Sequence, residues 1–246
     1  TIATATPPRN RPFSSEVKQA QFFYQDKFVI MGMKSSLLMY KYDFNVNNES
    51  GNSSNAANID LTRFNHYGKY LLNYEWNFQA DAQSVTCLSC INSVTSPIIL
   101  SSTSDKKLQV LDASEGKILR NTSLLYHEKN IHHIITPIPT AHIPLQSHHF
   151  NTFLTMSPEN LLVMWDLRSF QPSCQFSNHI NRRELSLQPS FSPCMKYIAV
   201  PSEDRSVRII DLRKSNDVVS NVRGGGSGVS ELYKIVTGQR DIISTV

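Results

Sequence analysis

Three segments of the chain repeat one pattern of apolar, hydroxyl and acidic residues. Each has an apolar stretch, a hydroxyl residue, one spacer, an acidic residue, a turn, a second apolar stretch and a closing Asp. The segments span residues 98–112, 153–166 and 198–211, and a weaker copy spans residues 28–43. A pattern repeated along a chain is typical of folds assembled from copies of one small unit. The repeat therefore constrains the fold more strongly than any single motif.

The acid and the hydroxyl residue keep the same register in the three copies. The acid lies seven residues before the closing Asp, and the hydroxyl residue lies two residues before the acid. The pairs are Thr103 with Asp105, Ser157 with Glu159, and Ser202 with Asp204. Because chemistry and spacing agree in all three, we interpret the pairs as a structural feature of each copy.

Short apolar runs separated by turn residues predict an all-β fold. The runs are rich in Val, Ile, Leu, Tyr and Phe, which favour strands, and no segment keeps a helical period over three turns. The chain has 246 residues, 40% of them hydrophobic, which suffices for the core of an all-β domain. The strand-length runs are at 28–31, 37–40, 97–100, 108–111, 161–165, 197–200 and 207–210.

The repeated segments resemble WD repeats. The resemblance rests on Met-Trp-Asp-Leu-Arg at 164–168 and on the segment 191–213, and it extends over about residues 16–246. One copy keeps the Trp of the motif, and Leu111 and Ile210 stand at that place in the others. The family implies four-stranded blades around a central channel. We therefore expect part of a WD-repeat β-propeller, with about four blades and the first strand of another.

The resemblance also implies a division of the chain into blades. An extended lead-in at 1–15 precedes a divergent blade at 16–80 with a disordered loop at 45–58, blades at 81–126, 127–177 and 178–236, and a first strand at 237–246. The blade at 178–236 contains a glycine-rich loop at 224–228. The chain begins without Met and ends on an apolar run, so we expect a piece of a longer propeller. Such an open end is expected to self-associate, because it leaves backbone groups unpaired.

In WD repeats a His, the hydroxyl residue, the acid and the Trp form a structural hydrogen-bond network. Carried over by position, the blade at 127–177 offers His127, Ser157, Glu159 and Trp165. The blade at 178–236 offers His179, Ser202 and Asp204, and the blade at 81–126 offers Thr103 and Asp105 without an evident His. A buried acid needs such donors, and the loss of one costs about 1–3 kcal/mol. The missing members predict blades of uneven stability.

The residue types that perform most catalysis are not arranged for it in this sequence. Cys87 and Cys90 have CxxC spacing, but no second ligand pair follows, and residues three apart on a strand point to opposite faces. The same alternation separates His132 from His133. The sequence contains neither a P-loop nor a nucleophile elbow. We therefore expect no enzyme activity, no metal site and no cofactor.

The expected function is a non-enzymatic scaffold for protein–protein interaction, with no small-molecule substrate. The formal net charge of +4 is spread along the chain, so no basic stripe predicts nucleic-acid binding. No stretch approaches the roughly 20 apolar residues that span a bilayer. We therefore expect a soluble intracellular protein, cytoplasmic or nuclear, with protein partners.

Two alternatives come from the same resemblance. Arg168 and Arg213 follow the closing Asp of their copies, as in WD proteins that resemble substrate receptors of cullin-4 type ubiquitin ligases. Those arginines would bind an acidic site of the ligase adaptor. Propellers that bind phosphoinositides carry a Phe-Arg-Arg-Gly motif, and the segments 181–184 and 221–224 do not match it. We therefore expect no membrane binding through such a site.

Overall fold

The computed structural model confirms that the chain is all-β. It describes residues 15–43, 69–78, 84–94, 96–123, 127–138, 147–177, 179–213 and 231–236. These residues also include a short 3₁₀ helix, η2 (Ser147–Asn151), which the sequence did not predict. The expected lead-in, the loops at 45–58 and 224–228, and the strand expected at 237–246 lie outside the described residues, except for Ser15.

The sixteen described strands form four sheets, each built from four consecutive strands paired antiparallel. The first sheet contains β1 (Val17–Phe23), β2 (Phe28–Met33), β3 (Ser36–Asp43) and β4 (Lys69–Asn77). The second contains β5 (Val85–Cys90), β6 (Ile98–Thr103), β7 (Lys107–Asp112) and β8 (Lys117–Ser123). The third contains β9 (His133–Ile135), β10 (Thr152–Met156), β11 (Leu162–Asp166) and β12 (Gln171–Phe176). The fourth contains β13 (Ser190–Phe191), β14 (Tyr197–Ser202), β15 (Ser206–Asp211) and β16 (Glu231–Val236).

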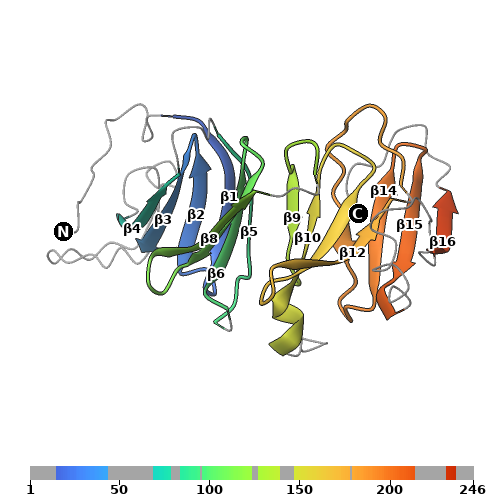
Figure 1. Cartoon of the computed structure of the whole chain (residues 1–246). Coiled ribbons are helices and arrows are strands. Elements are labelled where there is room, and N and C mark those ends of the chain that lie inside the picture. Colours follow the sequence, from blue (N-terminus) through green and yellow to red (C-terminus); the bar gives the residue numbers. More distant parts are fainter. Residues whose placement is uncertain are drawn as a thin grey trace, which may run out of the picture.

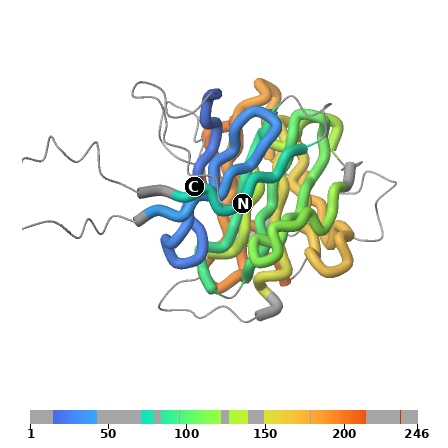
Figure 2. Tube along the Cα trace, turned by 90° about the vertical axis from the view of Figure 1, so that its left-hand side faces the viewer, coloured from blue at the N-terminus to red at the C-terminus, as the bar shows by residue number. Residues whose placement is uncertain are grey.

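The four sheets follow one another across the molecule in chain order (Figure 1). Seen from the end where the first sheet lies, the other sheets stand beside and behind it (Figure 2). The first strands of the first three sheets approach one another, because β1 contacts β5 and β5 contacts β9. The sheets are therefore arranged as successive layers that share one side formed by their first strands.

Each pair of neighbouring sheets encloses a hydrophobic core. Ile30 and Trp76 of the first sheet pack with Ile99 and Leu111 of the second. A second core lies between the second and third sheets, and a third core between the third and fourth. The middle strands of the second and third sheets are thus covered on both faces, which explains why they are nearly continuous apolar runs in the sequence. We call the face toward the preceding sheet the front face and the face toward the following sheet the rear face.

The outer strands lack this apolar signal. β8 and β12 form the last strand of their sheets, with the sequences Lys-Ile-Leu-Arg-Asn-Thr-Ser and Gln-Pro-Ser-Cys-Gln-Phe. Pro172 cannot donate a backbone hydrogen bond, and an edge strand is where a sheet tolerates proline. Edge position explains why the sequence patterns did not single out these strands.

One turn requires a glycine. Gly116 has a φ of 68° in the turn between β7 and β8, and a Cβ there would lie 2.4 Å from Cε1 of Tyr74. The carbonyl of Gly116 also accepts a hydrogen bond of 2.9 Å from the indole of Trp76. The turn of the second sheet is therefore fitted closely against β4 of the first. In the part of the chain that the structure describes, no helix is long and apolar enough to cross a membrane.

Candidate functional site

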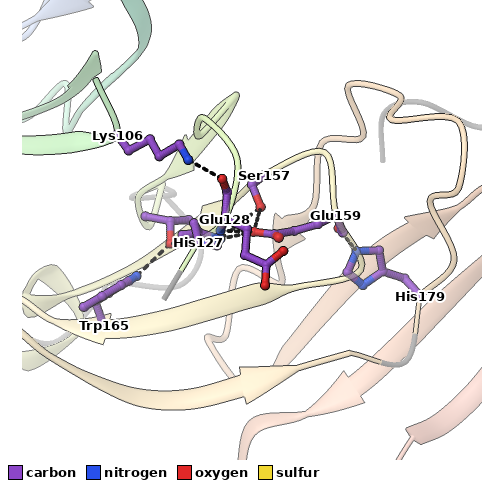
Figure 3. Close-up of polar contacts among 8 residues, drawn as sticks. Lys106, His127, Glu128, Ser157, Glu159, Trp165 and His179 are labelled. Atoms are coloured by element: carbon purple, nitrogen blue, oxygen red, sulfur yellow. Dashed lines mark hydrogen bonds and ion pairs between the residues drawn. The ribbon is translucent and has the colours of Figure 1, made fainter. Parts of the chain in front are cut away.

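The third sheet contains a chain of hydrogen bonds from an indole to a carboxylate. Nε1 of Trp165 donates to Oγ1 of Thr155 at 2.7 Å, and that hydroxyl lies 2.8 Å from Nε2 of His127. Nδ1 of His127 lies 2.9 Å from Oγ of Ser157 and 3.1 Å from Oε1 of Glu159. Ser157 itself donates to Glu159. Figure 3 shows the side chains of His127, Ser157, Glu159 and Trp165 gathered at this place.

One consistent assignment of donors and acceptors can be made for this series of hydrogen bonds. The Thr155 oxygen accepts from the indole, so its hydroxyl proton is free to go to Nε2 of His127. Nδ1 of the imidazole then carries the proton and donates toward Ser157 and Glu159. This assignment needs a neutral imidazole, and burial lowers the pKa of His127, although Glu159 opposes that shift. Thr155, Ser157 and His127 are all buried, which makes each hydrogen bond costly to lose.

The second sheet fills the equivalent positions with different residues. Thr103 donates to Asp105, and Nε2 of Gln109 donates to Thr103 at 2.9 Å. Nζ of Lys107 lies 2.8 Å from the Asp105 carboxylate. Burial opposes ionisation of Asp105, but the hydrogen bonds from Lys107 and Thr103 outweigh it and lower the pKa. Ser101 stands at the place of Thr155, and its buried hydroxyl has no hydrogen-bond partner among the residues that the structure describes.

The fourth sheet departs from the expected grouping of His179, Ser202 and Asp204. Nε2 of His179 lies 3.3 Å from the backbone oxygen of Glu159, so its hydrogen bond runs to the turn of the third sheet. Asp204 accepts from Ser206 and, at 3.2 Å, from Nη2 of Arg208. The guanidinium of Arg208 on β15 thus donates to the acid of the fourth sheet, whereas in the third sheet the acid is hydrogen-bonded to a histidine. Burial lowers the pKa of His179 to about 4, so this ring is neutral near pH 7.

Ser202 and neighbouring turn residues hold the segment that enters each sheet. Ser202 accepts from the backbone N–H of Ile180 at 3.0 Å. Glu159 accepts from the backbone N–H of Glu128 at 3.1 Å, and Ser104 accepts from that of Ser84 at 3.2 Å. In three successive sheets, a side chain at the end of the second strand or in the turn after it therefore accepts a backbone hydrogen bond from the segment that precedes the first strand.

Arg168 and Arg213 occupy equivalent positions, two residues after the closing Asp. The Arg168 side chain is 71% exposed and pairs with Asp166 at 3.3 Å. Arg213 is 55% exposed and pairs at 2.7 Å with Asp211, whose carboxylate is buried. The Arg213 guanidinium also donates to the hydroxyl of Tyr197 at 3.0 Å and lies over its ring, 5.4 Å from the centroid. The hydrogen bonds that the guanidinium donates to Asp211 raise the pKa of Arg213 further above its usual value.

The adjacent pair Arg182 and Arg183 lies beside a carboxylate. Glu203 accepts from both backbone N–H groups, at 2.6 Å and 3.2 Å, and pairs with Nε of Arg183 at 3.1 Å. An anionic ligand at this place would face the negative charge of Glu203, which weakens phosphate binding. The other segment compared with the phosphoinositide motif, 221–224, lies outside the described residues.

The first strands border a polar hollow of about 220 Å³. The side-chain amide of Gln19 donates to the backbone oxygen of Thr86 at 3.3 Å and accepts from the N–H of Leu88 at 2.6 Å. Gln21 accepts from the N–H of Cys90 at 2.9 Å. The two amides therefore satisfy the edge of β5 much as another strand would. The hollow is lined by Gln19, Ala20, Gln21, Cys87, Leu88, His133, Ile134 and Gln188.

The two cysteines lie in different cores, whereas the rings of the adjacent histidines His132 and His133 lie side by side with centroids 4.8 Å apart, contrary to the separation expected from strand alternation. Cys87 lies in the core between the second and third sheets, whereas Cys90 packs against the core between the first and second. Burial raises the pKa of both thiols to about 12. His132 bonds to the backbone oxygen of Leu187 at 3.0 Å, and His133 to the hydroxyl of Ser186 at 3.1 Å. Within the described ranges, no group of three His, Cys, Asp or Glu residues could hold a metal ion.

Sequence reasoning missed five residues of these acid sites, which are Thr155, Gln109, Arg208, Lys107 and Ser206. Thr155 is two residues before Ser157, so it points to the same face, and this spacing could have identified it. Gln109 and Arg208 both stand three residues before the closing Asp, where the third sheet has apolar Val163. A polar residue among apolar neighbours at that place was the available signal. A comparison of the sequence with models of known protein families finds no match.

Proposed function

We propose that the chain is a segment of a WD-repeat type β-propeller and acts as a non-enzymatic scaffold for protein partners. The observation that supports this proposal is the hydroxyl–acid site at one register position of three successive four-stranded sheets. Consecutive antiparallel sheets of four strands are the building units of propellers. A radial arrangement about one axis would follow if the shared side formed by β1, β5 and β9 faces the central channel.

The chemistry of the acid sites supports a structural use. Asp105, Glu159 and Asp204 each take hydrogen bonds from neighbouring side chains, and their sites lie between sheets. A carboxylate occupied in this way has little capacity left to act as a general base. The rigid layers instead hold turns and exposed strands in fixed positions, which is how scaffolds present binding surfaces.

The fold half of the proposal is tested by an experimental structure of the chain. We expect the four sheets to radiate from an axis beside the first strands. A flat parallel stack of the sheets would contradict a propeller, because blades must rotate about the axis.

The binding half is tested by proximity labelling in cells with the tagged chain. The control is the Trp165→Leu variant, which should weaken the third sheet while leaving surface residues unchanged. We expect a set of labelled proteins that depends on the intact fold. A set identical to that of the tag alone would contradict the scaffold role.

A second candidate function rests on the equivalence of Arg168 and Arg213. Both are exposed cations at matched positions of neighbouring sheets, and each is oriented by its own Asp. A pair of fixed guanidiniums could bind an acidic site on the adaptor of a cullin-4 type ubiquitin ligase. The test is adaptor recovery in a pull-down with the Arg168→Ala, Arg213→Ala double variant. Arg120→Ala, an exposed arginine on the outer strand β8, is the matched control. Equal recovery with the wild type and the double variant would reject a direct role.

A further inference from the structure

The turns between the second and third strands of the four sheets lie in a row along one end of the molecule. They span residues 34–35, 104–106, 157–161 and 203–205, and we call them the turn rim. Each of the first three turns is hydrogen-bonded to the part of the chain that enters the following sheet. These bonds connect the Lys34 oxygen with the N–H of Val85, the Lys106 ammonium with the oxygen of Glu128, and the Asn160 side chain with the N–H of Asn181. Since cores cover the front and rear faces of the middle sheets, the turn rim is one of the surfaces that these sheets expose.

Three of the four turns of the turn rim carry an exposed cation. Lys106 and Arg205 each come directly after the acid of their acid site, and Lys34 stands in the shorter turn of the first sheet. All three residues are exposed. In the third sheet Asn160, which is also exposed, follows the acid instead. Exposed positive charge therefore recurs along the turn rim from the first sheet to the fourth.

The conformation of these turns does not call for cations. Lys34, Lys106 and Arg205 have φ angles of 42°, 61° and 61°. Glycine and asparagine adopt this left-handed region more readily than lysine or arginine. Backbone hydrogen bonds close two of the turns, from Lys106 to the oxygen of Thr103 at 3.0 Å and from Arg205 to that of Ser202 at 3.2 Å. Because another residue would make these bonds equally well, the charges are available for a role outside the turns.

The carboxylates of the turn rim are less accessible than its cations. Asp105, Glu159 and Asp204 are half-buried and accept hydrogen bonds from side chains of their own sheets. The Lys106 ammonium has three protons and donates to a backbone oxygen, which leaves its charge without neutralisation by that contact. Glu128, in the segment that enters the third sheet, is an exposed carboxylate. The turn rim therefore presents positive charge at separate points instead of a continuous stripe.

We infer that the turn rim binds an acidic, extended segment of a partner protein, whose carboxylates pair with Lys34, Lys106 and Arg205. Carboxylates form charge-assisted hydrogen bonds with ammonium and guanidinium groups. The three cations stand on different sheets, so a segment must be extended to reach more than one of them. Nucleic acid fits less well, because its closely spaced phosphates would also face the carboxylates of the turn rim. The inference rests on the scaffold proposal for the class of partner, and it adds the surface and the chemistry of the bound segment.

The test measures binding of a fluorescein-labelled, glutamate-rich peptide by fluorescence anisotropy at low ionic strength, where charge pairs are least screened. The variant combines Lys34→Asn, Lys106→Asn and Arg205→Asn. Asparagine suits the left-handed conformation, so thermal unfolding should show a fold at least as stable as that of the wild type. We expect the dissociation constant of the peptide to rise about tenfold or more, because three charge-assisted contacts are lost.

A second triple variant controls for net charge. It combines replacements of exposed lysines outside the turn rim, Lys27→Asn, Lys117→Asn and Lys196→Asn. This variant should bind the peptide like the wild type. A wild type that does not bind the peptide, or equal weakening in both triple variants, would overturn the inference. A labelled single-stranded DNA that binds more tightly than the peptide would overturn the choice of an acidic protein segment. If the peptide does not bind but fold-dependent proximity labelling persists, the inference fails and the scaffold proposal stands.

Discussion

The acid sites of the second and third sheets occupy the same register but are completed differently. In the third sheet Thr155 accepts a hydrogen bond from Trp165 and contacts His127, so each polar group in this series of hydrogen bonds has a partner. In the second sheet Leu111 takes the place of the indole, and the hydroxyl of Ser101 is buried without a partner. From the sheet's own third strand, Lys107 pairs with Asp105, and Gln109 donates to Thr103 instead. The fourth sheet follows the second in this respect, with Arg208 in the place of Gln109.

The difference separates a fixed requirement from an interchangeable one. A carboxylate in the turn after the second strand is present in all three sheets, whereas the nitrogen donor beside it is an imidazole, an ammonium or a guanidinium. A partly buried acid needs donors but does not specify which residue supplies them. The third sheet draws its donor from the segment ahead of its first strand, so there the site also joins distant parts of the chain.

The largest effect is expected from replacing Trp165 of the third sheet with leucine, the residue that the second sheet has at this position. Trp165→Leu leaves a cavity beside Phe153 and removes the donor to Thr155. We expect a loss of about 3 kcal/mol in the free energy of unfolding, measured by urea denaturation. Trp165→Phe should lose less, because it keeps most of the buried volume. A loss below about 1 kcal/mol for Trp165→Leu would show that the indole is not central to the site.

A loss of stability in mild acid is expected from the buried histidine His179. The acid site of the second sheet contains no histidine. His179 has a pKa near 6.5 when exposed, and burial lowers it to about 4 in the fold. The unfolded chain therefore binds more protons between these values, so stability falls as pH decreases from 6.5 toward 4 and levels off below. The contribution of His179 is on the order of 3 kcal/mol. Urea midpoints at a series of pH values measure it, and His179→Gln should flatten the profile. Equal midpoints at pH 7 and pH 4.5 would contradict the prediction.

A matched pair of hydroxyl deletions tests the comparison most directly. Thr155→Val leaves the indole N–H and His127 without their shared partner, so we expect a loss of about 1–3 kcal/mol. Ser101→Ala removes a hydroxyl that already has no partner, so its effect should stay within about 0.5 kcal/mol or be stabilising. Chemical denaturation of both variants gives the two values. Similar losses would mean that the two sites do not differ as the hydrogen bonds indicate.

The smallest effect is expected from the ammonium of the second sheet. The side chains of Lys107 and Asp105 are 23% and 12% exposed, so water screens their ion pair in part. Lys107→Met should cost about 1 kcal/mol of unfolding free energy and raise the pKa of Asp105. Lys117→Met, which removes the exposed pair with Glu115, is the control and should show no measurable change. A loss equal to that of Trp165→Leu would contradict the ranking.

The strands and their order were predictable where the sequence is periodic. Apolar runs located the middle strands, because those strands are buried on both faces and need apolar residues throughout. The outer strands β8 and β12 gave no such signal, since one edge and much of their surface face solvent. The hydroxyl and acid were found from spacing alone. Thr155 was not found, although its position two residues before Ser157 places it on the same face of the strand.

The expected grouping of His179 with Ser202 and Asp204 shows a further limit. Position in the sequence placed His179 correctly ahead of the fourth sheet, but hydrogen bonding depends on the direction in which the ring points. The ring points to the turn of the third sheet, and Arg208 is long enough to reach Asp204 from the neighbouring strand. Spacing predicts which residues are near a site, whereas side-chain length and orientation decide which of them bind.

The free cysteines have a consequence for following how the molecule opens. Cys90 packs against the core between the first two sheets, Cys87 lies in the next core, and Cys174 lies in the last. Each core between two sheets therefore has its own cysteine thiol, which a reagent reaches only when the two sheets separate. The alkylation rates of these three thiols, compared with that of the more accessible Cys194, would show in what order neighbouring sheets separate.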